Sequence, residues 1–225
     1  MKVSTNIIIS TLVFLVVFTV MIALPYKSMS AVALPNFDED QDERSDVYNP
    51  LRSGRITDGS LVYESNGCAT CHTQVIRPTN AGADMWRNNW AGMANDEDRG
   101  DTRRETHSFD YLGQARANIG LMRVGPDLSN IGLRVATYIQ DTDLTPEMYL
   151  YLQLYNARAK VGAEQSNCPS NPYLFDKIKR YGATPKDALP IKDQEFIFVP
   201  NEKAQALVSY LLSLKKDDVA PAAIQ

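Results

Sequence analysis

The residues with the clearest chemistry are Cys68, Cys71 and His72, which stand in the run CATCH. Two cysteines separated by two residues and followed at once by histidine form the attachment signature of a c-type haem. Each thiol can add to one vinyl group of the porphyrin, and the histidine can then bind the iron as its proximal axial ligand. The motif therefore predicts one covalently attached haem c, with both cysteines as attachment sites and His72 as an iron ligand.

Two other uses of paired cysteines fit the sequence less well. A zinc site needs two further Cys or His ligands, and outside the motif the chain offers only Cys168 and His107. A thioredoxin-like redox pair belongs in a βαβ context, which the sequence does not suggest, and it does not need the adjacent histidine. The histidine directly after the second cysteine favours haem over both alternatives.

Composition sets broad limits on the function. The chain has 225 residues, 44% of them hydrophobic, and a net charge of −4, which is ordinary for one globular domain with accessory segments. No basic patch with interleaved aromatic residues is present, so we expect no nucleic-acid partner. The chain holds three cysteines, so attachment of haem to two of them leaves Cys168 to be explained.

The N-terminus contains an apolar run that predicts a membrane anchor over residues 1–35. Residues 7–24 carry no charge and are just long enough to cross the hydrocarbon layer as a helix, which Pro25 is expected to end. A cleaved signal peptide is the alternative, because residues 31–33 (AVA) resemble a cleavage site. The apolar run is longer than a usual signal-peptide core and ends well before that site, which favours the anchor.

The remainder of the chain is expected to lie outside the cytoplasm. Lys2 and Lys27 flank the apolar run equally and do not set its orientation. Haem c is attached outside the cytoplasm, so we expect a single-pass protein of the inner membrane with its haem domain on the periplasmic side. The acidic residues 36–48 read as a solvated linker, residues 49–217 as the haem domain, and residues 218–225 as a flexible tail.

Three stretches have the pattern of helices. Residues 56–66 predict a short amphipathic helix that leads into the cysteine motif. In residues 146–158, Met148 falls on the apolar face, so it is expected in the core and not on the iron. Residues 201–215 predict a last helix with Asn201 as its cap. Its apolar face consists of Leu207, Tyr210, Leu211 and Leu214.

The run GCATCHTQVIRP resembles the haem region of subunit II of cbb3-type cytochrome c oxidases, a membrane-anchored cytochrome with one haem. Further matches follow in the same order, namely HSF at 107–109, RVGPDL at 123–128, LYNAR at 154–158, SNCP at 166–169 and ALVSYL at 206–211. CxxCH is shared by all c-type cytochromes, whereas QVIRP directly after it is much more selective. The resemblance covers roughly residues 50–215 together with the anchor.

This resemblance implies a mainly α fold, with a class I-like cytochrome c domain behind a transmembrane helix. The last helix should then cross the helix that leads into the haem motif. Residues 80–121 and 174–199 stand out as insertions, expected to be surface elaborations or a contact surface for a partner. In the first, Trp86 and Trp90 have an i,i+4 spacing that suits packing; in the second, residues 196–199 predict a strand.

The resemblance also implies a role for Pro126 in the run GPDL. In cytochromes c a proline at such a place usually braces the proximal histidine through its carbonyl, which sets the orientation of the imidazole. The same residues fit an ordinary turn and helix start, in which proline fixes φ and Asp127 caps the helix.

The sixth iron ligand is where the sequence departs from the family. The family pattern has a methionine followed by proline, and here Cys168 stands before Pro169. The resemblance implies that Cys168 takes the place of this methionine and binds the iron as a thiolate. A thiolate ligand would lower the reduction potential below that of a His/Met haem. Alternatively Cys168 is a buried cysteine and the ligand is Met93, Met122 or His107. Met122 is the strongest substitute, and His107 matches a family histidine that is not taken as a ligand.

The expected function is electron transfer by a subunit of a respiratory membrane complex resembling a cbb3-type terminal oxidase, and not catalysis by this chain alone. The expected partners are membrane-embedded subunits of the oxidase or of another respiratory complex, and a cytochrome as electron donor. Three alternatives stay open: a gas or redox sensor with a displaceable distal ligand, an anchored electron shuttle outside the oxidase, and an assembly subunit with a structural haem. A low-potential haem fits poorly in a path to oxygen.

Overall fold

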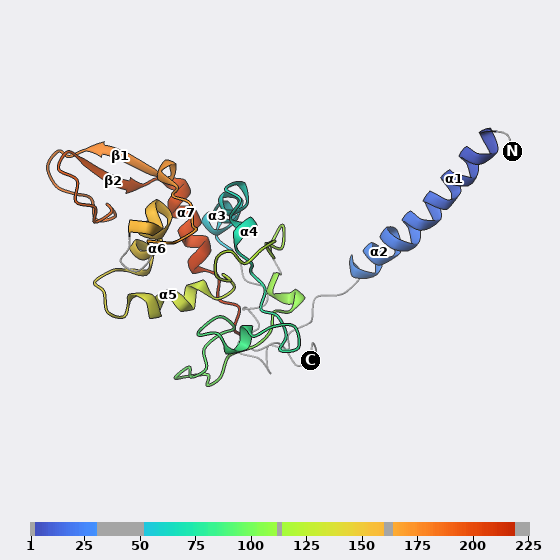
Figure 1. The fold of residues 1–225 in the computed structure, drawn as a ribbon, viewed down its shortest axis with the longest axis horizontal. Helices are drawn as coiled ribbons and strands as arrows, with labels where there is room; N and C mark the ends of the chain where they lie inside the picture. The colour runs from blue at the N-terminus through green and yellow to red at the C-terminus, as the bar shows by residue number, and fades with distance from the viewer. Residues whose placement is uncertain (1–2, 31–51, 112–113, 160–163, 219–225) are drawn as a thin grey trace. The chain divides into compact units, whose positions relative to one another are not determined.

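A computed structural model describes residues 3–30, 52–111, 114–159 and 164–218. The chain divides into two compact units, an N-terminal segment and a globular domain that begins near Asp46 (Figure 1). The expected linker at 36–48, the candidate cleavage site at 31–33 and nearly all of the expected tail lie outside the described residues.

The described part of the N-terminal unit, residues 3–30, is one long apolar helix. It consists of α1 (Val3–Phe18), a π-helical turn η1 (Thr19–Ala23) and α2 (Leu24–Ser30). The helix Val3–Ser30 is long and apolar enough to cross a membrane. This finding is consistent with a single-pass anchor and also with a signal sequence.

The expectation that Pro25 ends this helix is wrong, because α2 continues to Ser30. A proline inside a helix has no N–H to donate, and its ring collides with the carbonyl four residues earlier. Here the turn just before the proline is widened, and the Leu24 N–H donates to the carbonyl of Thr19, five residues back. We attribute the continuation of the helix to this π turn, which makes room for the ring.

Retention of the N-terminal helix can be tested directly. If it is an anchor, the mature protein keeps Met1 and remains in the membrane fraction after a carbonate wash, because its apolar side chains stay in the hydrocarbon layer. Mass spectrometry of the mature N-terminus makes the measurement. A mature protein that begins at Leu34 would show cleavage and remove the anchor.

The globular domain is mainly helical, as the sequence predicts. Its α-helices are α3 (Gly54–Ser65), α4 (Cys68–Cys71), α5 (Ile131–Ile139), α6 (Pro146–Asn156) and α7 (Glu202–Leu212). Its short 3₁₀ turns are η3 (Asp84–Trp86), η4 (Ser108–Tyr111), η5 (Ala157–Ala159) and η6 (Pro172–Leu174). The three helices expected from the sequence are confirmed, and the last ends at Leu212, before the expected Lys215.

Side-chain caps fix where the three longer of these helices begin. Ser53 caps α3, Thr145 caps α6, and the Asn201 side chain accepts a hydrogen bond of 3.1 Å from the Ala204 N–H at the start of α7. Each cap satisfies a backbone N–H that has no partner within the helix. The expected role of Asn201 is confirmed.

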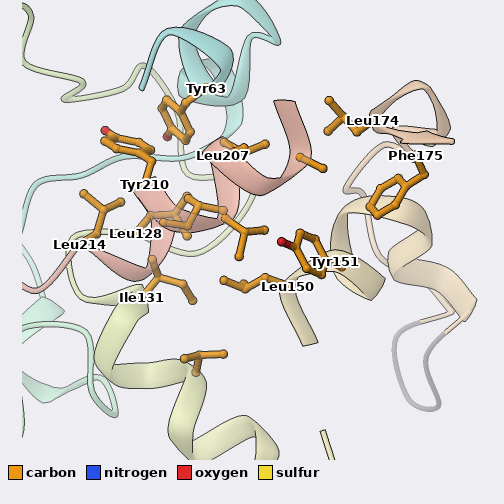
Figure 2. Close-up of a cluster of buried hydrophobic side chains, with 14 of the residues drawn as sticks. Tyr63, Leu128, Ile131, Leu150, Tyr151, Leu174, Phe175, Leu207, Tyr210 and Leu214 are labelled. Atoms are coloured by element: carbon orange, nitrogen blue, oxygen red, sulfur yellow. The ribbon is translucent and has the colours of Figure 1, made fainter. Parts of the chain in front are cut away.

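The core forms where α7 crosses α3 and packs against α5 and α6 (Figure 2). The rings of Tyr63 on α3 and Tyr210 on α7 lie 5.5 Å apart between their centroids. The crossing predicted from the family resemblance is therefore confirmed. The apolar face expected for the last helix is buried as predicted at Leu207, Tyr210 and Leu211 of α7, and Leu214, just after the end of α7, is buried too. Met148 is half-buried against this core, also as predicted.

The two helices approach each other through Gly59 of α3. A Cβ at this position would lie 2.0 Å from the carbonyl oxygen of Ala206, so no larger residue fits without moving backbone. Gly59→Ala should therefore lower the free energy of unfolding by about 1–3 kcal/mol, despite the gain in helix propensity of about 1 kcal/mol. The measurement is urea unfolding of the full chain in detergent.

Gly54→Ala is the matched control for this prediction. Gly54 is also in α3, and a Cβ there would meet nothing within 4 Å. Its substitution should leave the stability unchanged or raise it slightly. Equal urea midpoints for the two variants would show that the helix crossing tolerates a side chain and that the contact is not tight.

The second insertion contains a β-hairpin. Strand β1 (Phe175–Lys179) pairs antiparallel with β2 (Phe196–Pro200), in the register Phe175↔Pro200 to Lys179↔Phe196. The strand expected at 196–199 is confirmed. Phe175 holds the hairpin to α6 through an edge-on ring contact with Tyr155, 5.3 Å between centroids.

The expected packing of Trp86 with Trp90 in the first insertion is wrong. Trp86 is 73% exposed, whereas Trp90 is only 9% exposed. The i,i+4 spacing brings side chains together only in a helix, and here the 3₁₀ turn η3 ends at Trp86. Asn89 then has a φ of +53°, which is outside the helical region.

Candidate haem-binding site

The cysteine motif begins at a sharp turn between two helices. α3 ends at Ser65 with Asn66 as its C-cap, and Gly67 has a φ of +68°, a left-handed conformation that favours glycine. The single turn α4 follows at once, so Cys68 and Cys71 are three residues apart on one helical turn and face the same side. His72 then leaves the turn with extended backbone. Gly67 thus lets two thiols and an imidazole emerge close to the end of α3.

The His72 ring is held by a hydrogen bond between its Nδ1 and the carbonyl oxygen of Pro126, at 2.8 Å. A carbonyl oxygen only accepts, so Nδ1 carries the proton and the lone pair is on Nε2. Burial lowers the pKa of His72, an effect that the Pro126 carbonyl opposes and the charge of Arg134 reinforces. The neutral imidazole presents Nε2 as a possible metal ligand.

Two glycines bring the chain close around His72. A Cβ on Gly125 would lie 2.2 Å from His72 Cε1, and a Cβ on Gly120 would lie 2.1 Å from the His72 carbonyl oxygen. Gly120 also has a φ of +89°. Sequence reasoning missed Gly120, because a single glycine in a loop carries no distinguishing signal. Together these glycines let residues 120–126 pass directly over the histidine.

A cavity of about 490 Å³ lies beside the motif, lined by Cys68, Cys71 and His72. The helices α3, α4, α5, α6 and α7 all contribute to its wall. Much of the wall is apolar, with side chains that include Tyr63, Leu128, Ile131, Leu150, Leu154, Leu207 and Leu211. Burial, and secondarily the charge of Cys168, raises the pKa of the Cys68 thiol to about 11, so this thiol is protonated at neutral pH.

Cys168 lines the same cavity, between Asn167 and Pro169. Its loop is attached to the end of α6, because the Asn171 backbone N–H and side chain both donate to the carbonyl of Leu154, at 2.9 and 3.3 Å. The motif and Cys168, distant in the sequence, are therefore brought to one cavity.

The other residues considered as distal ligands lie elsewhere. Met93, Met122 and His107 do not line the cavity. Met122 is 50% exposed, on the loop that passes over the motif. The His107 backbone N–H donates to Asp110, and the Met93 backbone N–H donates to Thr102. The geometry of the described residues thus favours Cys168 among the four candidates.

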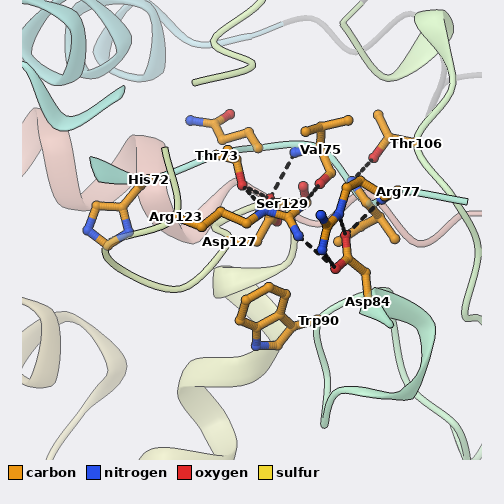
Figure 3. A network of polar contacts seen from close by, with 12 residues as sticks. His72, Thr73, Val75, Arg77, Asp84, Trp90, Thr106, Arg123, Asp127 and Ser129 are labelled. Carbon is orange, nitrogen blue, oxygen red and sulfur yellow. Dashed lines mark hydrogen bonds and ion pairs between the residues drawn. The ribbon is translucent and has the colours of Figure 1, made fainter. Parts of the chain in front are cut away.

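Asp127 holds the segment after the motif in place (Figure 3). Its buried carboxylate accepts hydrogen bonds from the Thr73 hydroxyl at 2.6 Å and from the backbone N–H groups of Val75 and Ser129, at 2.9 and 2.7 Å. The expectation that it caps a helix is wrong, because α5 begins only at Ile131. Two of these three donors, on Thr73 and Val75, belong to the chain that directly follows His72, so Asp127 ties that chain to the loop after Pro126.

Arg77 of the run QVIRP and Arg123 of the run RVGPDL both contact one buried carboxylate, that of Asp84. Arg123 donates to Asp84 at 2.6 Å and to the Thr73 hydroxyl at 2.8 Å, and Arg77 donates to Asp84 at 2.9 Å (Figure 3). Although burial opposes ionisation, these hydrogen bonds hold the pKa of Asp84 well below its usual range. Sequence reasoning missed Asp84, which belongs to none of the motifs and is fully buried.

The cysteines and the histidine of the cavity suit a metal-containing cofactor better than a single metal ion. Cys68, Cys71, His72 and Cys168 line one cavity. Yet within residues 3–30, 52–111, 114–159 and 164–218, no three His, Cys, Asp or Glu side chains converge closely enough to hold a metal ion. Cys68, Cys71 and His72 are the residues that would hold a haem, through its covalent attachment and an iron ligand.

Comparison with known proteins adds no assignment. No protein-family model matches the chain, and no curated protein matches it.

Proposed function

We propose that this protein is an electron-transfer subunit that carries one haem c on Cys68, Cys71 and His72. The observation that carries the proposal is the common cavity, which is lined by both thiols, by an imidazole with its Nε2 lone pair available, and by Cys168. A bound haem supplies a one-electron ferric/ferrous couple. The chain supplies its attachment, orientation and exclusion from water.

Attachment uses the two thiols of α4. Each S–H would add across one vinyl C=C bond of the porphyrin, with formation of a sulfur–carbon bond and transfer of the proton to the other vinyl carbon. No electron is gained or lost overall and nothing leaves. The single helical turn places both thiols on one side, which the two vinyl groups of one porphyrin require.

His72 and Cys168 are the residues that would bind the iron of a haem in this cavity. The Pro126 carbonyl fixes the orientation and tautomer of His72, which would leave Nε2 available to bind a haem iron. Cys168 is proposed as the distal thiolate, because it alone among the candidate ligands lines the cavity. An anionic sulfur stabilises ferric iron and lowers the reduction potential.

The proposed place of this subunit is a respiratory membrane complex similar to a cbb3-type terminal oxidase. The support is the run GCATCHTQVIRP and the ordered motifs that follow it. The apolar helix Val3–Ser30 suits a single-pass anchor with the haem domain on the periplasmic side. Electrons would arrive from a cytochrome donor and pass to membrane-embedded subunits.

The test is purification of the full chain from native membranes through a C-terminal affinity tag. The expected result is a haem that titrates reversibly with one electron, together with co-purification of a haem–copper catalytic subunit. Recovery of the haem protein alone from gently solubilised membranes would favour an anchored shuttle. A protein without covalent haem, in cells that mature other c-type cytochromes, would overturn the proposal.

A further inference from the structure

A lysine is buried in the globular domain just after the end of α7. Lys216 is only 6% exposed, although lysine side chains are almost never fully buried unless they are paired. Its Nζ lies 3.8 Å from the centroid of the Tyr111 ring and 3.5 Å from the backbone carbonyl oxygen of Gln74. In the described part of the chain, no carboxylate forms an ion pair with this amine. The ring and the carbonyl both favour an ammonium group, yet neither carries a full negative charge.

The charged side chains around Lys216 are of both signs. Asp110 and Asp127 favour the charged amine, and Arg52 and Arg104 oppose it. Asp110 is already bonded to Arg104 at 2.8 Å, and the Asp127 carboxylate accepts three hydrogen bonds from other groups. Burial is the largest effect, and it lowers the pKa of Lys216 to about 7. The amine can therefore gain and lose a proton near neutral pH.

Lys216 is joined to the candidate haem site through the chain that follows His72. Gln74, whose carbonyl oxygen faces the amine, is two residues after His72, so that oxygen lies within roughly 10 Å of the His72 Cα. The Tyr111 hydroxyl donates to the same oxygen, at 2.5 Å. Burial raises the pKa of Tyr111, so this hydroxyl keeps its proton at neutral pH. Of the two titratable groups at this carbonyl, Lys216 is the one that can change its charge there.

The chain between His72 and the lysine is held in place by its own hydrogen bonds. Thr73 and Val75, on either side of Gln74, both donate to the buried carboxylate of Asp127 (Figure 3). The Gln74 N–H donates to the carbonyl of Ile119 at 2.8 Å. At an effective dielectric constant of about 20, a unit charge roughly 12 Å away changes the proton affinity of an amine about tenfold. A change of one charge in the cavity therefore acts on the amine through a fixed separation.

We infer that Lys216 takes up a proton when the haem domain gains an electron, and releases it when the electron leaves. This inference rests on the proposed haem function. The oxidised site has one more positive charge, which favours the neutral amine, and reduction removes that charge and favours the ammonium group. The electron comes from the cytochrome donor and converts ferric to ferrous iron, while the proton comes from water and binds Nζ. One electron and one proton thus enter the domain together.

The test is the pH dependence of the reduction potential of the haem-loaded full chain in detergent. The potential of the wild type should fall as the pH rises through neutrality, by about 59 mV in total for a tenfold difference in proton affinity between the two oxidation states. Lys216→Met should hold the potential at its low, alkaline value, because this side chain is neutral in both states. Lys215→Met is the matched control, since Lys215 is the exposed neighbour, and it should keep the wild-type pH dependence.

Two results would contradict the inference and leave the proposed function intact, provided that haem stain on a denaturing gel shows attachment. One is a wild-type potential that does not change through neutral pH. The other is a pH dependence that persists in Lys216→Met. Absence of stained haem in the wild type would instead overturn the proposed function.

A measurement on the wild type covers the case in which Lys216→Met does not fold. With ¹⁵N-labelled lysine, NMR should show one amine nitrogen that titrates near neutral pH, and at a higher pH in the reduced protein than in the oxidised one. Exposed lysines titrate near pH 10.4 and stay separate from this signal. If every lysine nitrogen titrates well above neutral pH, or if the neutral titration is the same in both oxidation states, Lys216 does not carry the proton.

Discussion

Cys68→Ala combined with Cys71→Ala should yield a protein that carries no covalent haem. Both thioether bonds are lost, and the remaining imidazole of His72 binds iron too weakly to survive denaturation. Haem staining of denaturing gels makes the measurement, with immunoblotting to show that the protein is present. The expected loss is complete, which makes this the largest effect among the predictions.

Cys168→Ala is the matched control, because it removes the third thiol that lines the cavity. It should stain as strongly as the wild type, since Cys168 is proposed to bind iron and not the porphyrin edge. A stained double variant at Cys68 and Cys71 would refute the attachment sites. Loss of stain in Cys168→Ala would show that this cysteine is needed for attachment or folding.

Cys168→Met should raise the reduction potential by about a few hundred mV, within the roughly 0.8 V that axial ligands span. Methionine is neutral, so it removes the preference of a thiolate for ferric iron. The variant should also gain the near-infrared sulfur–iron charge-transfer band of a methionine ligand, which the wild type should lack. Spectroelectrochemical titration and near-infrared absorption of the ferric protein measure the two effects.

Met122→Leu is the control for the distal ligand, and it should leave both the potential and the spectrum unchanged. An unchanged spectrum in Cys168→Ala would refute Cys168 as the ligand, and a changed one in Met122→Leu would assign Met122. Ready binding of carbon monoxide by the reduced wild type would show an open or easily opened iron. That result would favour gas sensing over electron transfer.

Local sequence signals were enough to predict three helices of the domain, α3, α6 and α7, but α5 was not predicted. The cap at Asn201 follows from its residue type at the start of a helix, and the apolar face of α7 follows from the helical period. Both appear in the structure as predicted. The strand at 196–199 also followed from local composition, and its partner β1 did not. Pairing joins residues far apart in the sequence, and a local pattern does not contain that information.

The candidate site was predicted in part, and the missed residues have a common physical reason. The CATCH motif has a fixed spacing, whereas Asp84 and Lys216 act through contacts that only the fold creates. Trp86 was misplaced because its i,i+4 spacing to Trp90 has meaning only in a helix, and the chain is not helical there. Pro25 was expected to end the N-terminal helix, but a π turn just before it makes room for the proline ring and the helix continues.

The contact of Gly59 with Ala206 has a consequence for the electron transfer that we propose. Because backbone touches backbone at this crossing, the spacing of α3 and α7 does not depend on side chains that can change rotamer. The motif starts just after α3 ends, so its thiols and imidazole are mounted on a rigid frame. If the chain binds haem as proposed, this rigidity would keep the positions of the proposed ligands alike in both oxidation states, which would lower the reorganisation energy of each electron transfer.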